Sequence, residues 1–193
     1  MTSMCGIVGY VGSKSALDVV VAGLKRLEYR GYDSAGVAIV TEEGLSTRKK
    51  AGKLSNLQEV IAAEPLVDSC TGIGHTRWAT HGGPTDSNAH PHVSSDGSVA
   101  VIHNGIIENF AELRDELTGL GIELRSETDT EVAAHLLQIV LPTVGGDLGE
   151  AMRRVCRQLH GAFTLVAIVA DQPDVVVAAR RNSPLVVGRG EGE

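Results

Sequence analysis

The feature that most constrains the fold of this chain is the grouping of its apolar, strand-like segments into two sets. Amphipathic segments typical of helices accompany both sets. Because an element with one apolar face must bury that face against another layer, this order predicts an α+β layered sandwich. The strand-like segments of the first set cover residues 7–11, 37–40, a hairpin partner ending at 50, and 72–74; those of the second set cover 99–103, 123–125, 162–170, 175–179 and 185–187.

Helices are predicted where apolar residues recur every three or four positions. Ser15 and Ser55 each stand where a side chain would cap the first turn of such a segment. Thr128, followed by Glu131, matches a capping box and would bring Asp129 into the first helical turn. The expected helices cover residues 16–28, a short segment after Ser55, 110–120, 132–141 and 147–159.

Composition limits both the core and the partners of the protein. Aromatic residues make up only 3% of the 193 residues, so we expect a core of Val, Ile, Leu and Ala side chains. The net charge of -7 disfavours nucleic-acid binding. Since the sequence has no apolar run of about 18 residues and no signal-peptide pattern, it predicts a cytoplasmic protein without membrane association. The three cysteines are unevenly spaced, as expected for reduced thiols.

One of these cysteines, Cys5, lies almost at the N-terminus and leads into an apolar segment. If Met4 is removed, the thiol and the α-amine belong to one residue, and an amine that titrates near pH ~8 can accept the thiol proton. Taken alone, a single cysteine near a terminus is more often a small hydrophobic residue than a nucleophile. A catalytic role for Cys5 therefore depends on what the rest of the chain supplies.

A polar segment at residues 75–82 concentrates groups that bind substrates. Its sequence, HTRWATHG, holds an arginine, the only tryptophan and two histidines after a short strand. Loops that carry such residues beside glycines are common binding sites. A metal site is the alternative interpretation, although the spacing of its candidate ligands matches no zinc signature. Those candidates are His75, His81, His90 and His92.

Two further places have both a structural and a chemical interpretation. Asn104-Gly105 follows the strand at 99–103, and this pair is typical of a tight turn. The same side-chain amide and backbone N–H could instead donate to a developing oxyanion. Asp129 could interact with a helix dipole, or its carboxylate could hold a substrate ammonium group. The residues alone favour the turn for Asn104-Gly105 and leave both roles open for Asp129.

Six motifs, in order along the chain, carry a family resemblance. Together they resemble the glutaminase domain of isomerising glutamine:fructose-6-phosphate aminotransferases, which are N-terminal-nucleophile glutamine amidotransferases. The second and third motifs distinguish this family from other amidotransferases of the same class. The motifs are CGIVG at residues 5–9, YRGYDSAG at 29–36, HTRWATHG at 75–82, NAHPH at 88–92, HNGIIEN at 103–109 and SETDTE at 126–131.

The resemblance implies a four-layer αββα fold and the hydrolysis of L-glutamine to glutamate and ammonia, without a metal or organic cofactor. It implies that Cys5 attacks the side-chain amide to form a γ-glutamyl thioester, and that Asn104 and Gly105 form the oxyanion hole. The α-amine of Cys5 would take and return the proton.

The resemblance also implies how glutamine binds. A planar α-carboxylate suits a bidentate arginine, and an α-ammonium group suits a carboxylate. Arg77 would therefore hold the carboxylate and Asp129 the ammonium group, with Trp78 at the ammonia gate. The complete implied set of substrate-binding residues is Arg77, Trp78, Thr80, His81, Gly105 and Asp129.

Expectations for the boundaries and partners follow from the same resemblance. We expect residues 5–193 to form a glutaminase domain that lacks its last strands, and residues 1–4 to be a leader or extra residues before the nucleophile. The full-length family implies sugar isomerase domains, absent here, that use the ammonia to make glucosamine 6-phosphate in a homodimeric enzyme. If Cys5 is not freed at the N-terminus, the alternative is a non-catalytic glutamine-binding or regulatory module.

Overall fold

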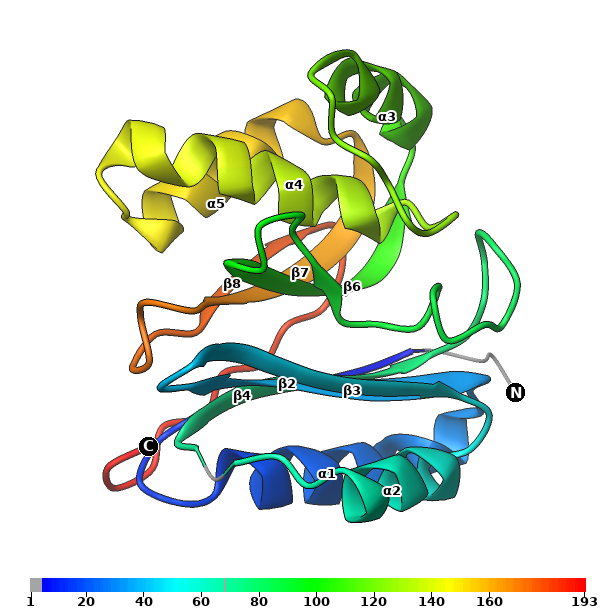
Figure 1. Cartoon of the computed structure of the whole chain (residues 1–193), viewed down its shortest axis with the longest axis vertical. Coiled ribbons are helices and arrows are strands. Elements are labelled where there is room, and N and C mark those ends of the chain that lie inside the picture. Colours follow the sequence, from blue (N-terminus) through cyan, green and yellow to red (C-terminus); the bar gives the residue numbers. More distant parts are fainter. Residues whose placement is uncertain (1–4, 68) are drawn as a thin grey trace.

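The computed structural model describes residues 5–67 and 69–193, so the expectation for residues 1–4 lies outside the described residues. Two sheets pack face to face, with α1 and α2 covering one and α3, α4 and α5 covering the other (Figure 1). The predicted four-layer αββα sandwich is confirmed. The elements are β1 (Gly6–Val11), α1 (Ala16–Leu27), η1 (Glu28–Arg30), β2 (Ser34–Thr41), β3 (Gly44–Ala51), α2 (Leu54–Ala63), β4 (Thr71–Arg77), β5 (His92–Val93), β6 (Val99–Ile107), α3 (Phe110–Gly119), α4 (Thr130–Val140), η2 (Leu141–Val144), α5 (Leu148–Gln158), β7 (Gly161–Val169) and β8 (Val177–Arg181).

The first sheet has the strand order β1-β4-β2-β3, with antiparallel neighbours throughout. Strands β2 and β3 form the predicted hairpin, which closes at the pair Thr41 and Gly44. In β2, a Cβ atom added to Gly36 would lie 2.1 Å from the carbonyl oxygen of His90. Glycine is therefore required where the segment around His90 crosses this sheet, and this close contact brings the NAHPH motif to the inner face of the sheet.

The second sheet has the order β5-β6-β7-β8 and is also antiparallel. Its strand β6 continues through Asn104 and Gly105, which pair with Thr164 and Phe163 of β7. The tight-turn interpretation of Asn104-Gly105 is therefore wrong. Gly105 has φ +130°, and an added Cβ would lie 2.1 Å from the carbonyl oxygen of Ala162. Glycine thus lets the strand continue with a conformation and a close approach that other residues resist.

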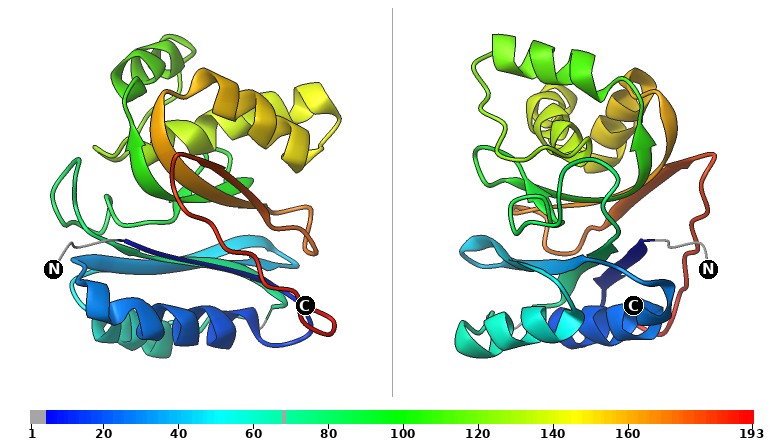
Figure 2. Two further views of the ribbon diagram at one scale, coloured as in Figure 1. Left: turned by 180° about the vertical axis from the view of Figure 1, so that it is seen from behind. Right: turned by 90° about the vertical axis from the view of Figure 1, so that its right-hand side faces the viewer.

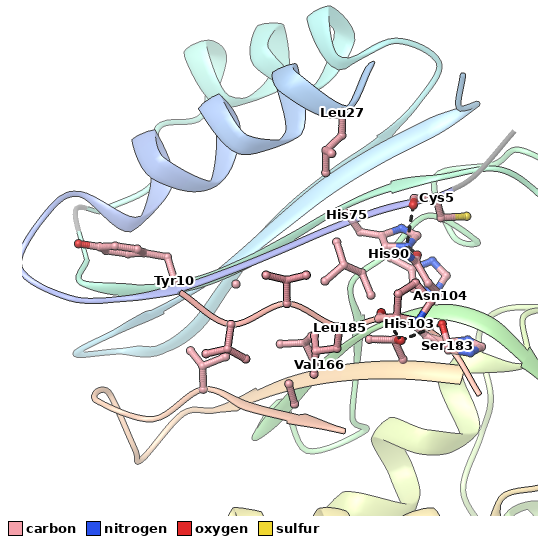
Figure 3. Close-up of a pocket in the computed structure, with 18 of the residues that line it drawn as sticks. Cys5, Tyr10, Leu27, His75, His90, His103, Asn104, Val166, Ser183 and Leu185 are labelled. Carbon is pink, nitrogen blue, oxygen red and sulfur yellow. Dashed lines mark hydrogen bonds between the residues drawn. The ribbon is translucent and has the colours of Figure 1, made fainter. Parts of the chain in front are cut away.

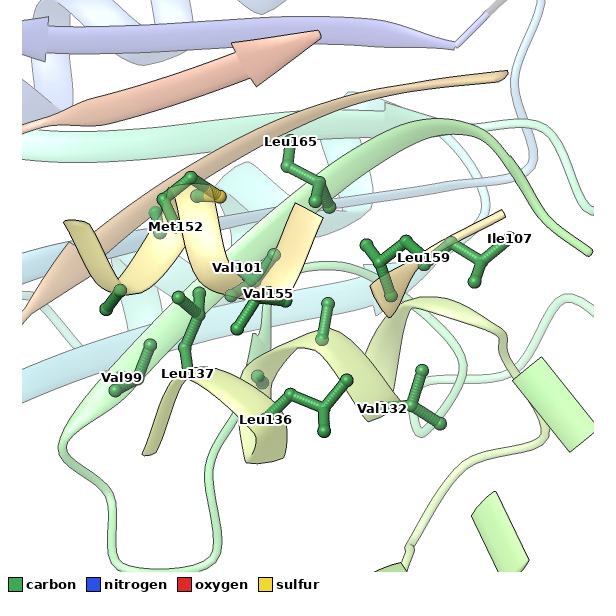
Figure 4. Close-up of a cluster of buried hydrophobic side chains, with 14 of the residues drawn as sticks. Val99, Val101, Ile107, Val132, Leu136, Leu137, Met152, Val155, Leu159 and Leu165 are labelled. Atoms are coloured by element: carbon green, nitrogen blue, oxygen red, sulfur yellow. The ribbon is translucent and has the colours of Figure 1, made fainter. Parts of the chain in front are cut away.

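Three apolar clusters lie between the four layers. The largest joins the second sheet to α3, α4 and α5, and Figure 4 shows valine and leucine side chains of this cluster. A second cluster joins the first sheet to α1 and α2, and a third lies between the two sheets. Phe163 and Tyr10 are the aromatic members of these clusters. The expected core of small aliphatic side chains is confirmed.

Two predicted strands are wrong. Residues 122–125 form no strand, because Ile122 and Leu124 pack individually against the largest apolar cluster instead of pairing with a neighbour. Residues 185–187 also form no strand. They belong to the segment that runs from β8 past the edge of both sheets (Figure 2), and Val186 is 91% exposed. The preceding strand, β8, lies two residues later than predicted at each end.

The helix caps differ from the sequence patterns in two of three places. The Ser15 hydroxyl accepts a hydrogen bond from the backbone N–H of Asp18, as predicted. The cap at Ser55 is wrong, because α2 already begins at Leu54 and has no side-chain cap. The capping box is also wrong. Asp129 is itself the N-cap residue of α4, and its side chain makes no cap hydrogen bond. No helix of the described residues is long and apolar enough to cross a membrane.

Candidate active site

A cavity of about 1170 Å³ lies between the two sheets (Figure 3). It collects side chains from the start of β1, the end of β4, the middle of β6 and the start of α4, four segments that are far apart in the sequence. Seven of the eight residues implied by the resemblance line this cavity, and His81 is not among the lining residues. The seven are Cys5, Arg77, Trp78, Thr80, Asn104, Gly105 and Asp129.

The thiol of Cys5 sits at one end of the cavity, next to the backbone of Trp78. The Trp78 N–H donates to Cys5 Sγ over 3.1 Å, and the thiol lies 3.7 Å from the Trp78 carbonyl oxygen, to which it donates. Burial raises the pKa of Cys5, and the Trp78 N–H and the charge of Arg77 only partly offset this effect. The thiol is consequently protonated at neutral pH and needs a base before it can act as a nucleophile.

Arg77, the last residue of β4, is almost fully buried at 4% exposure. Its guanidinium group donates to the backbone carbonyls of His81, Gly82 and Gly83, with distances of 3.4 Å to Gly82 and 3.3 Å to Gly83. These neutral acceptors come from the loop that follows β4. A carboxylate that displaced one of them would form a stronger, charge-assisted pair with the same guanidinium.

Asn104 links the second sheet to the nucleophile. Its Nδ2 donates to the backbone carbonyl of Cys5 over 3.0 Å, and its Oδ1 lies 2.7 Å from Nε2 of His75 (Figure 3). The side-chain amide therefore directs its N–H groups toward Cys5. An oxyanion that forms on a substrate bound to Cys5 would develop within reach of this donor.

Asp129 lines the same cavity as Cys5 and is 4% exposed. Its Oδ2 accepts a hydrogen bond from the backbone N–H of Ile107 over 2.8 Å, and its Oδ1 lies 3.9 Å from Nδ1 of His103. The carboxylate is thus held by β6 although its own backbone begins α4. The Thr130 hydroxyl also donates to Oδ1 over a long 3.5 Å. A carboxylate oxygen with this one long bond can still accept from a cationic group in the cavity.

The YRGYDSAG motif contributes a residue that the sequence analysis did not identify. Asp33 Oδ2 accepts from the Ala79 N–H over 2.6 Å, and the Asp33 N–H donates to the Arg77 carbonyl over 2.7 Å. Asp33 therefore fixes the loop that carries Trp78. The signal was present in the sequence as a charged residue in a turn between apolar elements, because such a residue needs partners when it is buried.

Three more predicted residues, Trp78, Thr80 and His81, lie on the loop that follows β4. Thr80 lines the cavity, whereas the ring of His81 packs 5.0 Å from the ring of Phe110, centroid to centroid. Contact with a substrate by either side chain stays a prediction. Trp78 is 44% exposed, which is unusual for the only tryptophan of the chain and leaves its indole at the mouth of the cavity.

Four buried histidines lie beside this site: His75, His90, His92 and His103. The His75 and His90 rings are 4.3 Å apart, and those of His90 and His92 are 4.7 Å apart. Burial lowers the pKa of all four, so the rings are neutral at physiological pH. They bond to hydroxyl and amide groups, and the described residues contain no group of three potential ligands that suits a metal ion. The structure therefore gives no support to the metal-site alternative.

Known proteins resemble this chain in sequence over nearly its whole length. The family model described as "Glutamine amidotransferase domain" matches residues 75–193, which is more than half of the chain. The chain belongs to the glutamine amidotransferase family. This amidotransferase is 70% identical over 190 residues to glutamine--fructose-6-phosphate aminotransferase (isomerizing) of Streptomyces coelicolor, over 98% of the chain and 31% of that relative. An enzyme of the same name from Thermus thermophilus is 57% identical, with the same coverage. The resemblance drawn from the motifs is confirmed.

Solved structures agree with the amidotransferase assignment. Glutamine phosphoribosylpyrophosphate amidotransferase from B. subtilis superposes with a TM-score of 0.70 at 27% identity, covering 85% of this chain and 35% of that one. A structure described as the allosteric regulatory enzyme of purine biosynthesis gives 0.71, with the same identity and coverage. The amidotransferase chain spans about a third of the length of the sequence relatives it matches.

Proposed function

We propose that this chain hydrolyses L-glutamine to glutamate and ammonia, with Cys5 as the nucleophile. One observation carries the proposal: a thiol, an amide donor, a guanidinium group and a carboxylate line a single cavity. They belong to Cys5, Asn104, Arg77 and Asp129. These are the groups that a free amino acid with a side-chain amide needs, since it presents one carboxylate, one ammonium group and one scissile carbonyl.

Binding would exchange contacts within the protein for contacts with the substrate. The α-carboxylate of glutamine would replace backbone carbonyls on the Arg77 guanidinium group, and the α-ammonium group would approach Asp129 and the backbone of Gly105. Because the loop that carries these carbonyls also carries Trp78, Thr80 and His81, binding would reposition the loop over the substrate. Closure of this kind separates the site from bulk water and retains ammonia until a water molecule is admitted for hydrolysis of the thioester.

The chemistry would proceed in two acyl transfers. The Cys5 α-amine takes the thiol proton while Sγ forms a bond to the amide carbon, and the oxyanion receives hydrogen bonds from Asn104 Nδ2 and the Gly105 N–H. The C–N bond then breaks, and ammonia leaves with the proton returned by the amine. Water attacks the γ-glutamyl thioester through a second oxyanion, releasing glutamate and the thiol.

This mechanism depends on a free α-amine at Cys5. Burial raises the pKa of the Cys5 thiol, so the thiolate does not form unaided at neutral pH. The α-amine is the base available on the same residue once residues 1–4 are removed. We therefore propose that the active form begins at Cys5.

In the longer protein, we propose that the ammonia is transferred to fructose 6-phosphate by sugar isomerase domains that follow this one, in a homodimer. The proposal is supported by the names of the relatives and by their length, about three times that of this chain. The exposed Trp78 at the cavity mouth is the candidate gate for ammonia leaving toward those domains.

Intact mass before and after treatment with an electrophilic glutamine analogue, such as a diazoketone, tests the proposal. We expect a chain that begins at Cys5 and gains one adduct, which peptide mapping assigns to Cys5. The matched variants are Cys5→Ser, which should lose the adduct, and Cys70→Ser, which should keep it although Cys70 is exposed. A full-length mass without an adduct would refute glutamine hydrolysis and favour the glutamine-binding module.

A further inference from the structure

His75 lies on β4, on the inner face of the first sheet, and contacts the amide of Asn104 on the second sheet. It is 1% exposed, and its Nε2 lies 2.7 Å from Asn104 Oδ1 across the gap between the two sheets. Figure 3 shows the contact within a line of three groups, from His75 through Asn104 to Cys5. The direction of each hydrogen bond in this line can be derived from chemistry.

The backbone carbonyl of Cys5 determines the orientation of the Asn104 amide. The backbone carbonyl of Cys5 can only accept, so the Asn104 atom 3.0 Å from it must be Nδ2. The other end of the amide, Oδ1, then faces His75 Nε2 at 2.7 Å. Because Oδ1 can also only accept, Nε2 must carry the proton. A flipped amide would bring two acceptor oxygens together at Cys5.

The His75 ring has little freedom to adopt another arrangement. Burial lowers the pKa of His75 to about 3, against the opposing effect of its bond to Asn104, so the neutral ring carries a single proton. Its Nδ1 is buried and makes no hydrogen bond of good geometry, although the backbone of His103 lies close enough to the ring to raise the pKa of His75 slightly against the effect of burial. The His90 ring lies alongside it, with centroids 4.3 Å apart. Moving the proton from Nε2 to Nδ1 would leave both Nε2 and Asn104 Oδ1 as facing acceptors.

We propose that His75 is a positioning residue for Asn104: its Nε2–H holds Oδ1 and thereby aims Nδ2 at the carbonyl under attack by Cys5. This inference rests on the proposed glutamine hydrolysis and adds a role that none of the six motifs assigned to this histidine. The bond has a second effect, because an amide whose oxygen accepts a hydrogen bond donates more strongly through its N–H. Both effects act on the oxyanion rather than on the glutamine ground state.

The proton can be observed without any enzyme activity. A long-range ¹H–¹⁵N spectrum of the histidine rings should show His75 with a protonated Nε2 and a bare Nδ1. Replacing Asn104 by alanine should change the Nε2–H signal of His75 while leaving that of His135 in place. His135 is equally buried, on α4, and contacts Glu131 instead. A His75 ring with the proton on Nδ1, or with two protons, would overturn the proposal.

Kinetics on protein whose first residue is Cys5 test the consequence. We expect His75→Leu to lower kcat for glutamine hydrolysis by about 10-fold to 10²-fold with little change in KM, since a misdirected donor acts on the transition state. His75→Gln, whose amide N–H can reach Oδ1, should recover most of the loss. The control His135→Leu removes an equally buried ring away from Asn104 and should leave kcat near the wild-type value.

A double-mutant cycle separates positioning from a general structural role. In the Asn104→Ala background, His75→Leu should cost less than about 3-fold, because its target is gone. An equal loss in both backgrounds, or a His75→Gln protein that folds and is as slow as His75→Leu, would overturn the proposal. If the wild type is active and His75→Leu has the same kcat, this inference alone would be overturned. Inactive wild type that begins at Cys5 would overturn the proposed function and this inference with it.

Discussion

The carboxylate of Asp33 accepts a hydrogen bond from the backbone N–H of Ala79 over 2.6 Å and so joins the turn before β2 to the loop after β4. The same loop brings the Trp78 N–H to 3.1 Å from Cys5 Sγ. Asp33 therefore acts on the nucleophile in two ways. It fixes the loop that donates to the thiol, and its negative charge raises the pKa of Cys5.

Neutralising Asp33 should make the thiol more acidic. Asp33→Asn keeps an oxygen that can accept from Ala79 but removes the charge that raises the pKa of Cys5. We expect the midpoint of the pH dependence of Cys5 alkylation to move to lower pH, because the thiolate is no longer repelled. The control is Asp115→Asn, on the exposed face of α3. An unchanged or higher midpoint for Asp33→Asn would contradict this account.

Replacing Arg77 should weaken glutamine binding. Arg77→Ala removes a buried guanidinium group, and truncating one partner of a desolvated charge pair costs about 2–5 kcal/mol. We therefore expect KM for glutamine to rise by about 30-fold or more. Arg77→Lys keeps the charge but loses the two-pronged geometry, so its KM should fall between those of wild type and alanine. A KM unchanged in Arg77→Ala would mean that another group binds the α-carboxylate.

A side chain at Gly105 should destabilise the fold as well as the site. Gly105 combines φ +130° with only 2.1 Å between an added Cβ and the Ala162 carbonyl oxygen. We expect Gly105→Ala to lower the free energy of unfolding by about 2–4 kcal/mol, measured by urea denaturation. Gly119→Ala is the control, because a Cβ there would meet no atom within 4 Å. Equal stability of the two variants would contradict the close approach of β6 and β7.

The contribution of Glu131 to the free energy of unfolding should depend on pH. Burial by itself raises its pKa, but contact with His135 and hydrogen bonds from Ser126 and the Arg125 N–H outweigh burial and lower the pKa to about 2, from 4.5. A carboxylate whose pKa is lower in the folded state stabilises the fold above its unfolded pKa. That stability, on the order of 3 kcal/mol, is lost as the pH falls from about 4.5 toward 2.

Glu131→Gln should remove this dependence. We expect its free energy of unfolding to be lower than that of wild type at pH 7, with the difference shrinking as the pH falls through this window. The exposed Glu59→Gln provides the matched control and should follow the wild-type curve. If wild type and Glu131→Gln lose stability in parallel below pH 4.5, the stabilising role of the Glu131 carboxylate would be refuted.

Much of the fold could be predicted from local patterns. The α+β sandwich, the hairpin at 41–44 and all five helices follow from local patterns, and the structure differs at the ends of these elements by a few residues. The four-layer αββα order was implied by the family resemblance. The strand predictions at 123–125 and 185–187 are wrong for one shared reason. Alternating apolar residues indicate only that some side chains are buried. A segment becomes a strand when its backbone pairs with a neighbouring strand, and local sequence does not show whether such a neighbour exists.

For the candidate site, too, some features could be predicted from the sequence and others depend on the tertiary structure. By itself, the sequence determined which residues are candidates for the chemistry, because the motifs around Cys5, Arg77, Asn104 and Asp129 hold a nucleophile, a cation, an amide and a carboxylate in recognisable order. Only the tertiary structure decided that Asn104 lies within a strand and not in a turn, and that His75 directs its amide. The physical reason is that both facts depend on pairing between separate strands and sheets, and such contacts arise only when the two sheets close on each other.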